Sequence, residues 1–386
     1  MSSPAKKAQS HLPEATSPTA QSPKGNAKSP TPGPASPTPG PASPAAVHAG
    51  EPTDLLSGAH WGELEIPDDN DSTLVSDAES STASITSTIL DYRTISGRTY
   101  HSDAVTDSEY WGPNDEKANE VLDIFHHAMT LLFDDRLYTA PLSKDIENAL
   151  DVGTGTGLWA IDFADEFPNC RVVGTDISPI QPSWVPPNLS FNIDDATKEW
   201  AFQPDLFDYI HIRWLCGTIK DWPSLYKEAY RCTKPGGWIE HVDGDVNVVC
   251  LDGTMPDDSA MNQWGKIWTS VERKTGNVFN IVRTGIMEDG LKEAGFTNVQ
   301  IEDYLFWAPT GPWPTTEKEK QIGFFHYIFS TQDIEGFLNY FLGQVMGWTD
   351  KEMANYAAAI RREYKEGKIH GYIKWRVVRA QKPLDA

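Results

Sequence analysis

The chain has 386 residues, of which 55 are acidic and 32 are basic, and its net charge is −23. This balance argues against direct nucleic-acid binding, because phosphate recognition needs a basic face. The four cysteines form no CxxC pair, so neither a zinc ribbon nor a disulfide framework is expected. No apolar run reaches the roughly 18 to 20 residues that span a bilayer, and the first ten residues lack the apolar core of a signal peptide. We therefore expect a soluble intracellular protein without a membrane segment.

The beginning of the chain differs in composition from the rest. Residues 1–50 contain 11 of the 28 prolines, and such a segment buries too little apolar surface to offset its chain entropy. We expect a disordered Pro/Ser-rich and then acidic tail at 1–87, followed by one folded domain at 88–386. The predicted parts of that domain are an N-terminal cover at 88–145, a core at 146–310, and a helical insert with the last strand at 311–383.

The next segments predict an α/β fold. Residues 114–133 have apolar positions at helical spacing, with Asn114 placed to cap the helix and Asp115 and Glu116 in its first turn. Strands are predicted at 148–152, 170–176, 189–193, 207–214, 238–242, 299–306 and 371–379. Helices are predicted at 158–167, 225–232, 261–274 and 284–294, with a helical stretch at 317–364. Alternating helices and continuous apolar strands are typical of a mostly parallel sheet with helices on both faces.

The most informative motif is a glycine-rich turn between the first of these strands and the helix after it. Asp151 is followed by Gly153, Thr154, Gly155 and Gly157, in the spacing GxGxG. A dinucleotide-binding GxGxxG turn would need glycine at 158, where the chain has leucine. Glycines let the backbone approach a ligand closely and present free N–H groups to it. The turn resembles motif I of class I S-adenosylmethionine-dependent methyltransferases, in which this loop curves around the methionine part of the cofactor.

Acidic residues follow the next two strands. Asp176, with Ile177 after it, ends the second strand, where a carboxylate can accept hydrogen bonds from both hydroxyls of a ribose. The third strand ends in Asp194, Asp195 and Ala196, a turn suited to the exocyclic amine of adenine. We favour Asp195 for this contact, with Asp194 as the alternate. Each acid alone also fits a solvated loop or a helix cap, but their order along successive strand ends favours a cofactor site.

Two further side chains are weak catalytic candidates. Arg213 lies near the carboxyl end of the fourth strand, where ligands bind in open α/β sheets, and it is also a candidate cofactor residue. An ion pair with a nearby acid is its alternative role. His241 follows a Pro-Gly-Gly turn and a strand, so it is a candidate general base, although a single histidine is more often structural. No metal site is predicted.

Longer segments resemble the fungal LaeA-like methyltransferases. They include GTGTGLW at 153–159, FDYIHIRWLCGTIKDW at 207–222 and AYRCTKPGGWIE at 229–240, with further similarity over roughly 88–383. The resemblance implies a seven-stranded class I methyltransferase fold with an N-terminal helical cover and S-adenosylmethionine as cofactor. It also implies a nuclear or nucleocytoplasmic role in controlling metabolite genes, within a velvet-type regulatory complex. The chain departs from the family at Val121, where arginine is expected, and at His241-Val242-Asp243.

Three functions are open at this point. The chain is a LaeA-like regulator that methylates a protein or acts in a complex, a tailoring enzyme that methylates a small molecule, or a binding module that transfers nothing. Methyl transfer from a sulfonium is an in-line displacement, so alignment and water exclusion matter more than a dedicated base. The acceptor is therefore expected to be either a small molecule or a protein.

Overall fold

The computed structural model describes residues 54–65, 89–106, 110–308 and 313–386. Most of the predicted tail lies outside the described residues, but its segment 54–65 does not. There, α1 (Gly58–Gly62) packs against α10 (Asp350–Glu366), and Trp61 is 2% exposed beside Tyr356. The prediction of disorder is wrong for this segment. A single tryptophan in a polar stretch gives no periodic signal, and the helix that covers it lies nearly 300 residues further along the chain.

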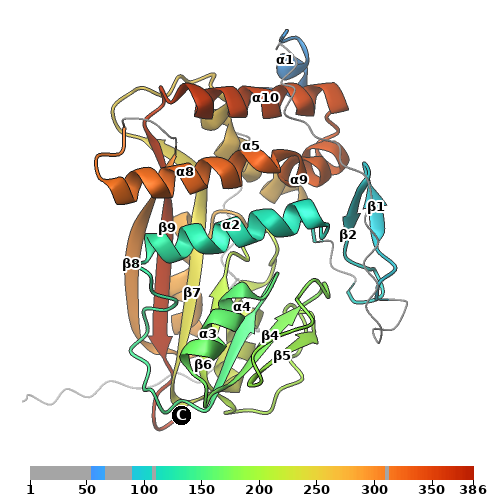
Figure 1. Cartoon of the computed structure of the whole chain (residues 1–386). Coiled ribbons are helices and arrows are strands. Elements are labelled where there is room, and N and C mark those ends of the chain that lie inside the picture. Colours follow the sequence, from blue (N-terminus) through green and yellow to red (C-terminus); the bar gives the residue numbers. More distant parts are fainter. Residues whose placement is uncertain (1–53, 66–88, 107–109, 309–312) are drawn as a thin grey trace, which may run out of the picture. The chain divides into compact units, whose positions relative to one another are not determined.

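Seven strands form one sheet in the order β5-β4-β3-β6-β7-β9-β8 (Figure 1). All neighbouring pairs from β5 to β7 are parallel, and β9 is antiparallel to both of its neighbours. The strands are β3 (Asn148–Val152), β4 (Arg171–Asp176), β5 (Leu189–Ile193), β6 (Phe207–Arg213), β7 (Thr233–Cys250), β8 (Thr297–Ala308) and β9 (Gly371–Gln381). This topology confirms the predicted seven-stranded, mostly parallel class I methyltransferase fold. A separate hairpin joins β1 (Arg93–Ile95) and β2 (Arg98–Tyr100).

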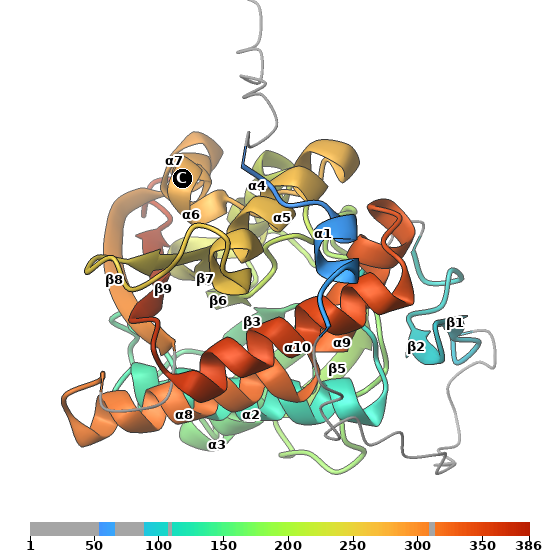
Figure 2. The ribbon, with the colours of Figure 1, turned by 90° about the horizontal axis from the view of Figure 1, so that it is seen from above.

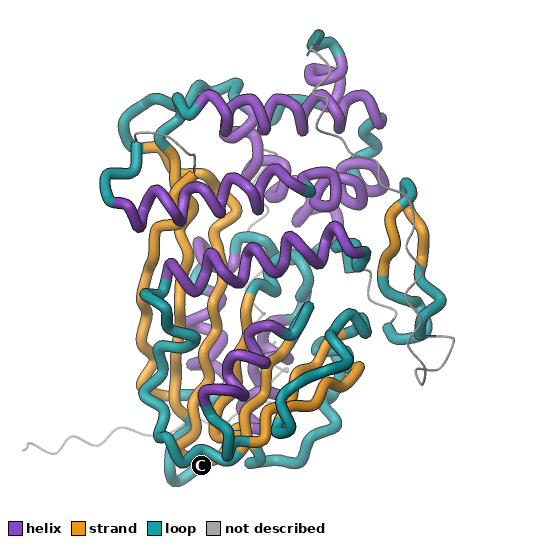
Figure 3. Tube along the Cα trace, viewed as in Figure 1, coloured by secondary structure: helices purple, strands orange, loops and turns teal. Residues whose placement is uncertain are grey.

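Helices cover both faces of the sheet. Figure 2 shows α2, α3 and α8 along one face, and α4, α5, α6 and α7 along the other, while Figure 3 distinguishes the helices from the strands of the sheet. The helices are α2 (Glu116–Leu132), α3 (Leu158–Glu166), α4 (Trp222–Cys232), α5 (Ala260–Thr275), α6 (Ile281–Thr284), α7 (Ile286–Ala294), α8 (Glu317–Gln332), α9 (Ile334–Leu338) and the π-helix η1 (Asn339–Val345). Among the described residues, none of these helices is long and apolar enough to cross a membrane.

Three predicted elements need correction. The side chain that caps α2 is Asp115, which accepts a hydrogen bond from the N–H of Ala118, and Asn114 precedes the cap. Strand β7 continues to Cys250, well beyond the predicted end. The antiparallel pairing with β9 reaches from Trp238 to Cys250, and it extends the strand through a segment whose polar residues gave no strand signal. The helical stretch 317–364 is divided into α8, α9, η1 and most of α10.

Strand register brings the candidate residues to one edge. On β3, Asp151 lies beside Gly174 of β4 and beside His211 of β6. Because these strands are parallel, their carboxyl ends meet at the same edge of the sheet, where ligands bind in open α/β folds. Asp176 and Arg213, which end β4 and β6, therefore lie at the edge where the glycine-rich turn begins.

Candidate functional site

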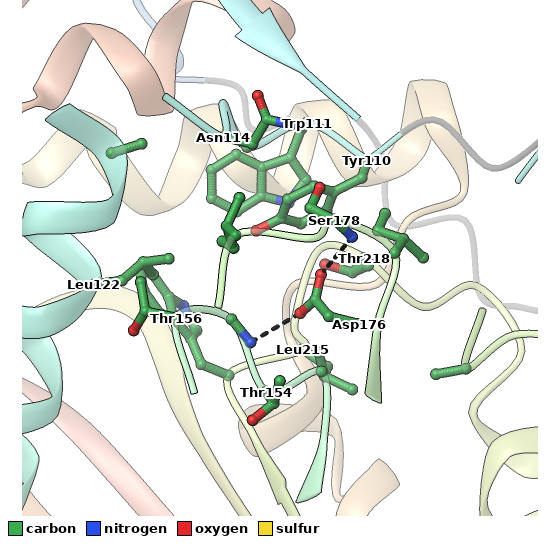
Figure 4. A pocket seen from close by; sticks show the side chains of 18 of the residues that line it. Tyr110, Trp111, Asn114, Leu122, Thr154, Thr156, Asp176, Ser178, Leu215 and Thr218 are labelled. Carbon is green, nitrogen blue, oxygen red and sulfur yellow. Dashed lines mark hydrogen bonds between the residues drawn. The ribbon is translucent and has the colours of Figure 1, made fainter. Parts of the chain in front are cut away.

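A cavity of about 170 Å³ opens at this edge, beneath α2 (Figure 4). Of the eleven predicted cofactor residues, all but Gly157 line it. They are Asp151, Gly153, Thr154, Gly155, Asp176, Ile177, Asp194, Asp195, Ala196 and Arg213. The structure thus gathers residues from four strand ends around one space.

The glycines of the turn have a backbone conformation that other residues rarely adopt. The φ angles of Gly153, Gly155 and Gly157 are 68°, 59° and 85°. Gly157 lies outside the cavity lining, and it matters for packing: a Cβ atom there would lie 2.4 Å from Cζ of Phe191 on β5. Gly157 therefore allows the close approach of Phe191 to the turn, and its predicted contact with the cofactor stays a prediction.

Asp176 is held by backbone groups. One carboxylate oxygen accepts a hydrogen bond from the N–H of Gly155 at 2.8 Å, and the other accepts one from the N–H of Ser178 at 3.0 Å (Figure 4). Burial raises the pKa of Asp176 to about 6, against the lowering effect of these hydrogen bonds. Each oxygen can accept more than one hydrogen bond, so the fixed carboxylate can still accept from a diol.

Asp151, near the end of β3, stabilises the turn that follows this strand. Its carboxylate accepts a hydrogen bond from Oγ1 of Thr154 at 2.6 Å and another from Nδ1 of His211 at 2.7 Å. The imidazole of His211 stacks on Trp159, with ring centroids 3.7 Å apart. Burial lowers the pKa of His211 to about 4, so at neutral pH the ring is uncharged. Asp151 is therefore a buried positioning residue whose two oxygens are both in use.

The two acids at the end of β5 differ in their partners. Asp195 is buried, and its carboxylate accepts hydrogen bonds from Oγ1 of Thr106 and from both the N–H and Oγ1 of Thr197. Asp194 is half-buried, and burial raises its pKa while the N–H of Asp195 opposes this. Asp194, the alternate in the sequence analysis, therefore has more hydrogen-bonding capacity left for a ligand than Asp195.

Arg213 belongs to a chain of three side chains. Its guanidinium donates a hydrogen bond to Nδ1 of His126 at 3.1 Å, and Nε2 of His126 is 2.9 Å from Asp162. Since a guanidinium only donates, Nδ1 of His126 accepts, and the protonated Nε2 donates a hydrogen bond to the carboxylate of Asp162. Burial lowers the pKa of Arg213 to about 10, which leaves it charged at neutral pH. The Arg213 guanidinium is the cation that this arrangement presents to the cavity.

His241 is enclosed away from the cavity. It is fully buried, its Nδ1 lies 2.8 Å from Oη of Tyr226, and its ring stacks on Trp222. Its Nε2 lies 3.3 Å from Asp243. This placement is typical of a structural histidine, and the catalytic role of His241 stays a prediction without support from the lining of the cavity.

The loop after β6 has a conformation that the sequence pattern did not predict. Trp214 has a φ of 55°, a left-handed conformation that is uncommon and strained for a bulky side chain. The fully buried carboxylate of Asp243, at the end of the His241-Val242-Asp243 departure, fixes this loop by accepting 3.0 Å hydrogen bonds from the N–H groups of Leu215 and Cys216. Asp243, within β7, thus fixes the loop in which Trp214 lies.

A second cavity, of about 100 Å³, adjoins the first. We call it the aromatic chamber. Trp111, Trp214 and Phe337 line both cavities. The remaining aromatic residues of the chamber lining are Trp264, Trp268, Phe279, Phe306, Phe329, Tyr364 and Trp375. The two cavities therefore adjoin at three aromatic side chains that line both.

The segment Tyr110–Asn114 lines the first cavity and precedes α2. Arg98 of the hairpin anchors its surroundings, because it donates hydrogen bonds to the carboxylates of both Asp115 and Asp333. These two acids are the N-cap residues of α2 and α9. One arginine thus joins the hairpin to both helices that cover the cavity.

Comparisons with known proteins agree with the geometry. Residues 124–301 match the model of a methyltransferase domain. The chain is 37% identical over 309 residues to methyltransferase pytC of Aspergillus terreus, covering 80% of this chain and 93% of that protein. It is 33% identical to the secondary metabolism regulator LAE1 of Cochliobolus heterostrophus, covering 74% and 94%, and 31% identical to protein-methionine methyltransferase laeA of Emericella nidulans, covering 75% and 76%. The chain therefore belongs to the LaeA-like S-adenosylmethionine-dependent methyltransferases.

Proposed function

We propose that this methyltransferase transfers the methyl group to a small apolar molecule held in the aromatic chamber. The observation that carries the proposal is the sharing of Trp111, Trp214 and Phe337 by the two cavities. A donor in the first cavity and an acceptor in the second would meet at these rings, which also exclude water from the reacting atoms. Such alignment supplies much of the rate of an in-line displacement.

In this proposal the residues of the first cavity hold the cofactor. Asp176 accepts hydrogen bonds from the ribose hydroxyls, and Asp194 accepts one from the adenine amine. The turn 153–156 surrounds the methionine part, and the charged Arg213 attracts its carboxylate. When bound, the cofactor supplies the methyl group and the leaving sulfur. The protein supplies position and a dry, fixed environment.

A second candidate is regulation of secondary metabolism, with a protein as the methyl acceptor and a velvet-type complex in the nucleus. Identity of 33% to the regulator LAE1 over 94% of that protein favours it. The lining of the chamber favours a small molecule instead, because it is rich in aromatic side chains and suits an apolar compound better than a polar protein segment.

The two candidates differ in where the methyl group is found. The full chain is incubated with methyl-labelled S-adenosylmethionine and, separately, with an organic extract of fungal metabolites or with fungal protein. We expect label in the organic-soluble fraction, absent with an Asp176→Ala variant. Label that precipitates only with protein would contradict the small-molecule acceptor and support the regulator. Absence of label from both fractions would contradict methyl transfer to either class.

A further inference from the structure

The composition of the aromatic chamber limits what it can hold. Of the residues that line it, Asp245 is the one with a formal charge, and its carboxylate already accepts hydrogen bonds from Asn247 and Arg283. Aromatic rings prefer stacked or edge-to-face contacts with other rings. Trp268 and Phe279, for example, stack with centroids 5.3 Å apart. The chamber therefore suits a planar, uncharged ring system.

One polar side chain in this apolar lining has hydrogen-bonding capacity to spare. His326 of α8 is fully buried and stacks on Phe306, with centroids 4.3 Å apart and planes 12° apart. Its Nδ1 lies 2.7 Å from the carbonyl oxygen of Trp307. A carbonyl only accepts hydrogen bonds, so Nδ1 carries the proton and Nε2 has a lone pair. The geometry thus fixes the tautomer.

The lone pair on Nε2 accepts no short hydrogen bond from the part of the protein that the structure describes. Oη of Tyr364 lies 3.5 Å from it, which is long for a hydrogen bond with a hydroxyl donor. Burial lowers the pKa of His326 to about 4, so the ring is neutral and Nε2 accepts rather than donates. A buried acceptor that lacks a good partner is unfavourable, and a ligand hydroxyl would satisfy it.

We propose that the aromatic chamber binds a planar aromatic compound with a hydroxyl group, a phenol or an enol, which donates a hydrogen bond to Nε2 of His326. This inference rests on the proposed function and specifies its acceptor class. His326 lines the chamber and not the cofactor cavity, so it acts as a recognition residue at a distance from the transferred methyl group.

The test uses matched probes. 7-Hydroxycoumarin and 7-methoxycoumarin share a planar ring system, but only the first has a hydroxyl donor. Each is titrated calorimetrically into the full chain saturated with S-adenosylhomocysteine, which fills the cofactor cavity and leaves the chamber as the available site. We expect the hydroxyl compound to bind about fivefold to tenfold more tightly, as one hydrogen bond in a buried site provides.

Two variants test whether His326 causes the tighter binding of the hydroxyl compound. His326→Phe keeps an aromatic ring against Phe306 but lacks Nε2, so both probes are expected to bind within about twofold of each other. Tyr364→Phe keeps His326 and is expected to keep the preference. Retained affinity for S-adenosylhomocysteine shows that each variant is folded.

Either of two results would overturn the proposal. One is that the unmodified chain binds both probes with equal affinity or binds neither probe. The other is a preference that persists in His326→Phe. Neither result decides the proposed small-molecule activity. That activity is tested by methyl label in the organic-soluble fraction and does not depend on which probe binds. Thus a chain that methylates an organic-soluble acceptor but ignores the hydroxyl refutes only the role of His326.

Discussion

The carboxylate of Asp176 accepts a 2.8 Å hydrogen bond from the backbone N–H of Gly155, which lies 21 residues earlier in the chain. This contact joins the end of β4 to the turn that follows β3. It explains why the glycine motif and the strand-end acid occur together in the sequence: the turn fixes the acid, and the acid fixes the turn. Substitution of either residue is expected to disturb both.

The ionisation of Asp176 predicts a pH dependence of cofactor binding. Burial raises its pKa to about 6, and ribose hydroxyls donate to the charged form. S-adenosylmethionine should therefore bind most tightly above pH 6, and its affinity should fall as the pH drops through that value. Asp176→Asn removes the titrating group, so its weaker binding should vary much less over the same range. An equally steep decline in the variant would assign the effect to another group.

The two acids at the end of β5 should separate into a binding role and a structural role. Asp194→Ala is expected to weaken S-adenosylmethionine binding about threefold to tenfold, the worth of one hydrogen bond, with little change in Tm. Asp195→Ala removes a hydrogen-bond acceptor of both Thr106 and Thr197, so it should lower Tm. Calorimetric titration and thermal denaturation of both variants test this. The reverse pattern would restore Asp195 as the adenine ligand.

Substitution at Gly157 tests the packing of the turn. Gly157→Ala combines a positive φ with a Cβ atom 2.4 Å from the ring of Phe191. The matched control is Gly276→Ala, because Gly276 has a similar φ of 76° but nothing within 4 Å of the added atom. The control should cost about 1 kcal/mol of unfolding free energy from backbone strain alone, and Gly157→Ala should cost clearly more. Equal losses by denaturant unfolding would show that the contact with Phe191 relaxes freely.

Asp243 is expected to act on Trp214 through the loop. Asp243→Ala leaves the buried N–H groups of Leu215 and Cys216 without their acceptor, at about 1–3 kcal/mol each. The variant should be less stable, and it should lose methyl transfer by more than it loses cofactor affinity. Thermal denaturation, cofactor titration and label transfer by the folded variant check this. Unchanged transfer would mean that Trp214 is held without Asp243.

The central part of the fold was predictable because each signal there is local. The strands Asn148–Val152 and Leu189–Ile193 have the predicted boundaries, since each is a short segment with several apolar residues that turn residues bound on both sides. The strand-end acids could be placed on one edge because parallel topology aligns carboxyl ends. That reasoning brought Asp151, Asp176 and Arg213 to a single cavity.

The aromatic chamber was not predictable in the same way. Its lining combines Trp111, Trp214, Phe337 and Trp375, which lie more than 250 residues apart at the extremes. Tryptophan and phenylalanine carry the same sequence signal in a core as in a cavity, so only their packing distinguishes the two. The positive φ of Trp214 and the attachment of α1 through Trp61 likewise depend on contacts between distant segments.

The central claim is that the cavity at the carboxyl edge of the sheet binds the methyl donor through Asp176. Its most direct test is calorimetric titration of the full chain with S-adenosylmethionine, beside an Asp176→Ala variant and NAD as a control ligand. We predict saturable binding of S-adenosylmethionine, no binding of NAD, and a loss of at least tenfold in the variant, about 1.4 kcal/mol. Equal affinity in the folded variant, or no binding by the unmodified chain, would contradict the claim.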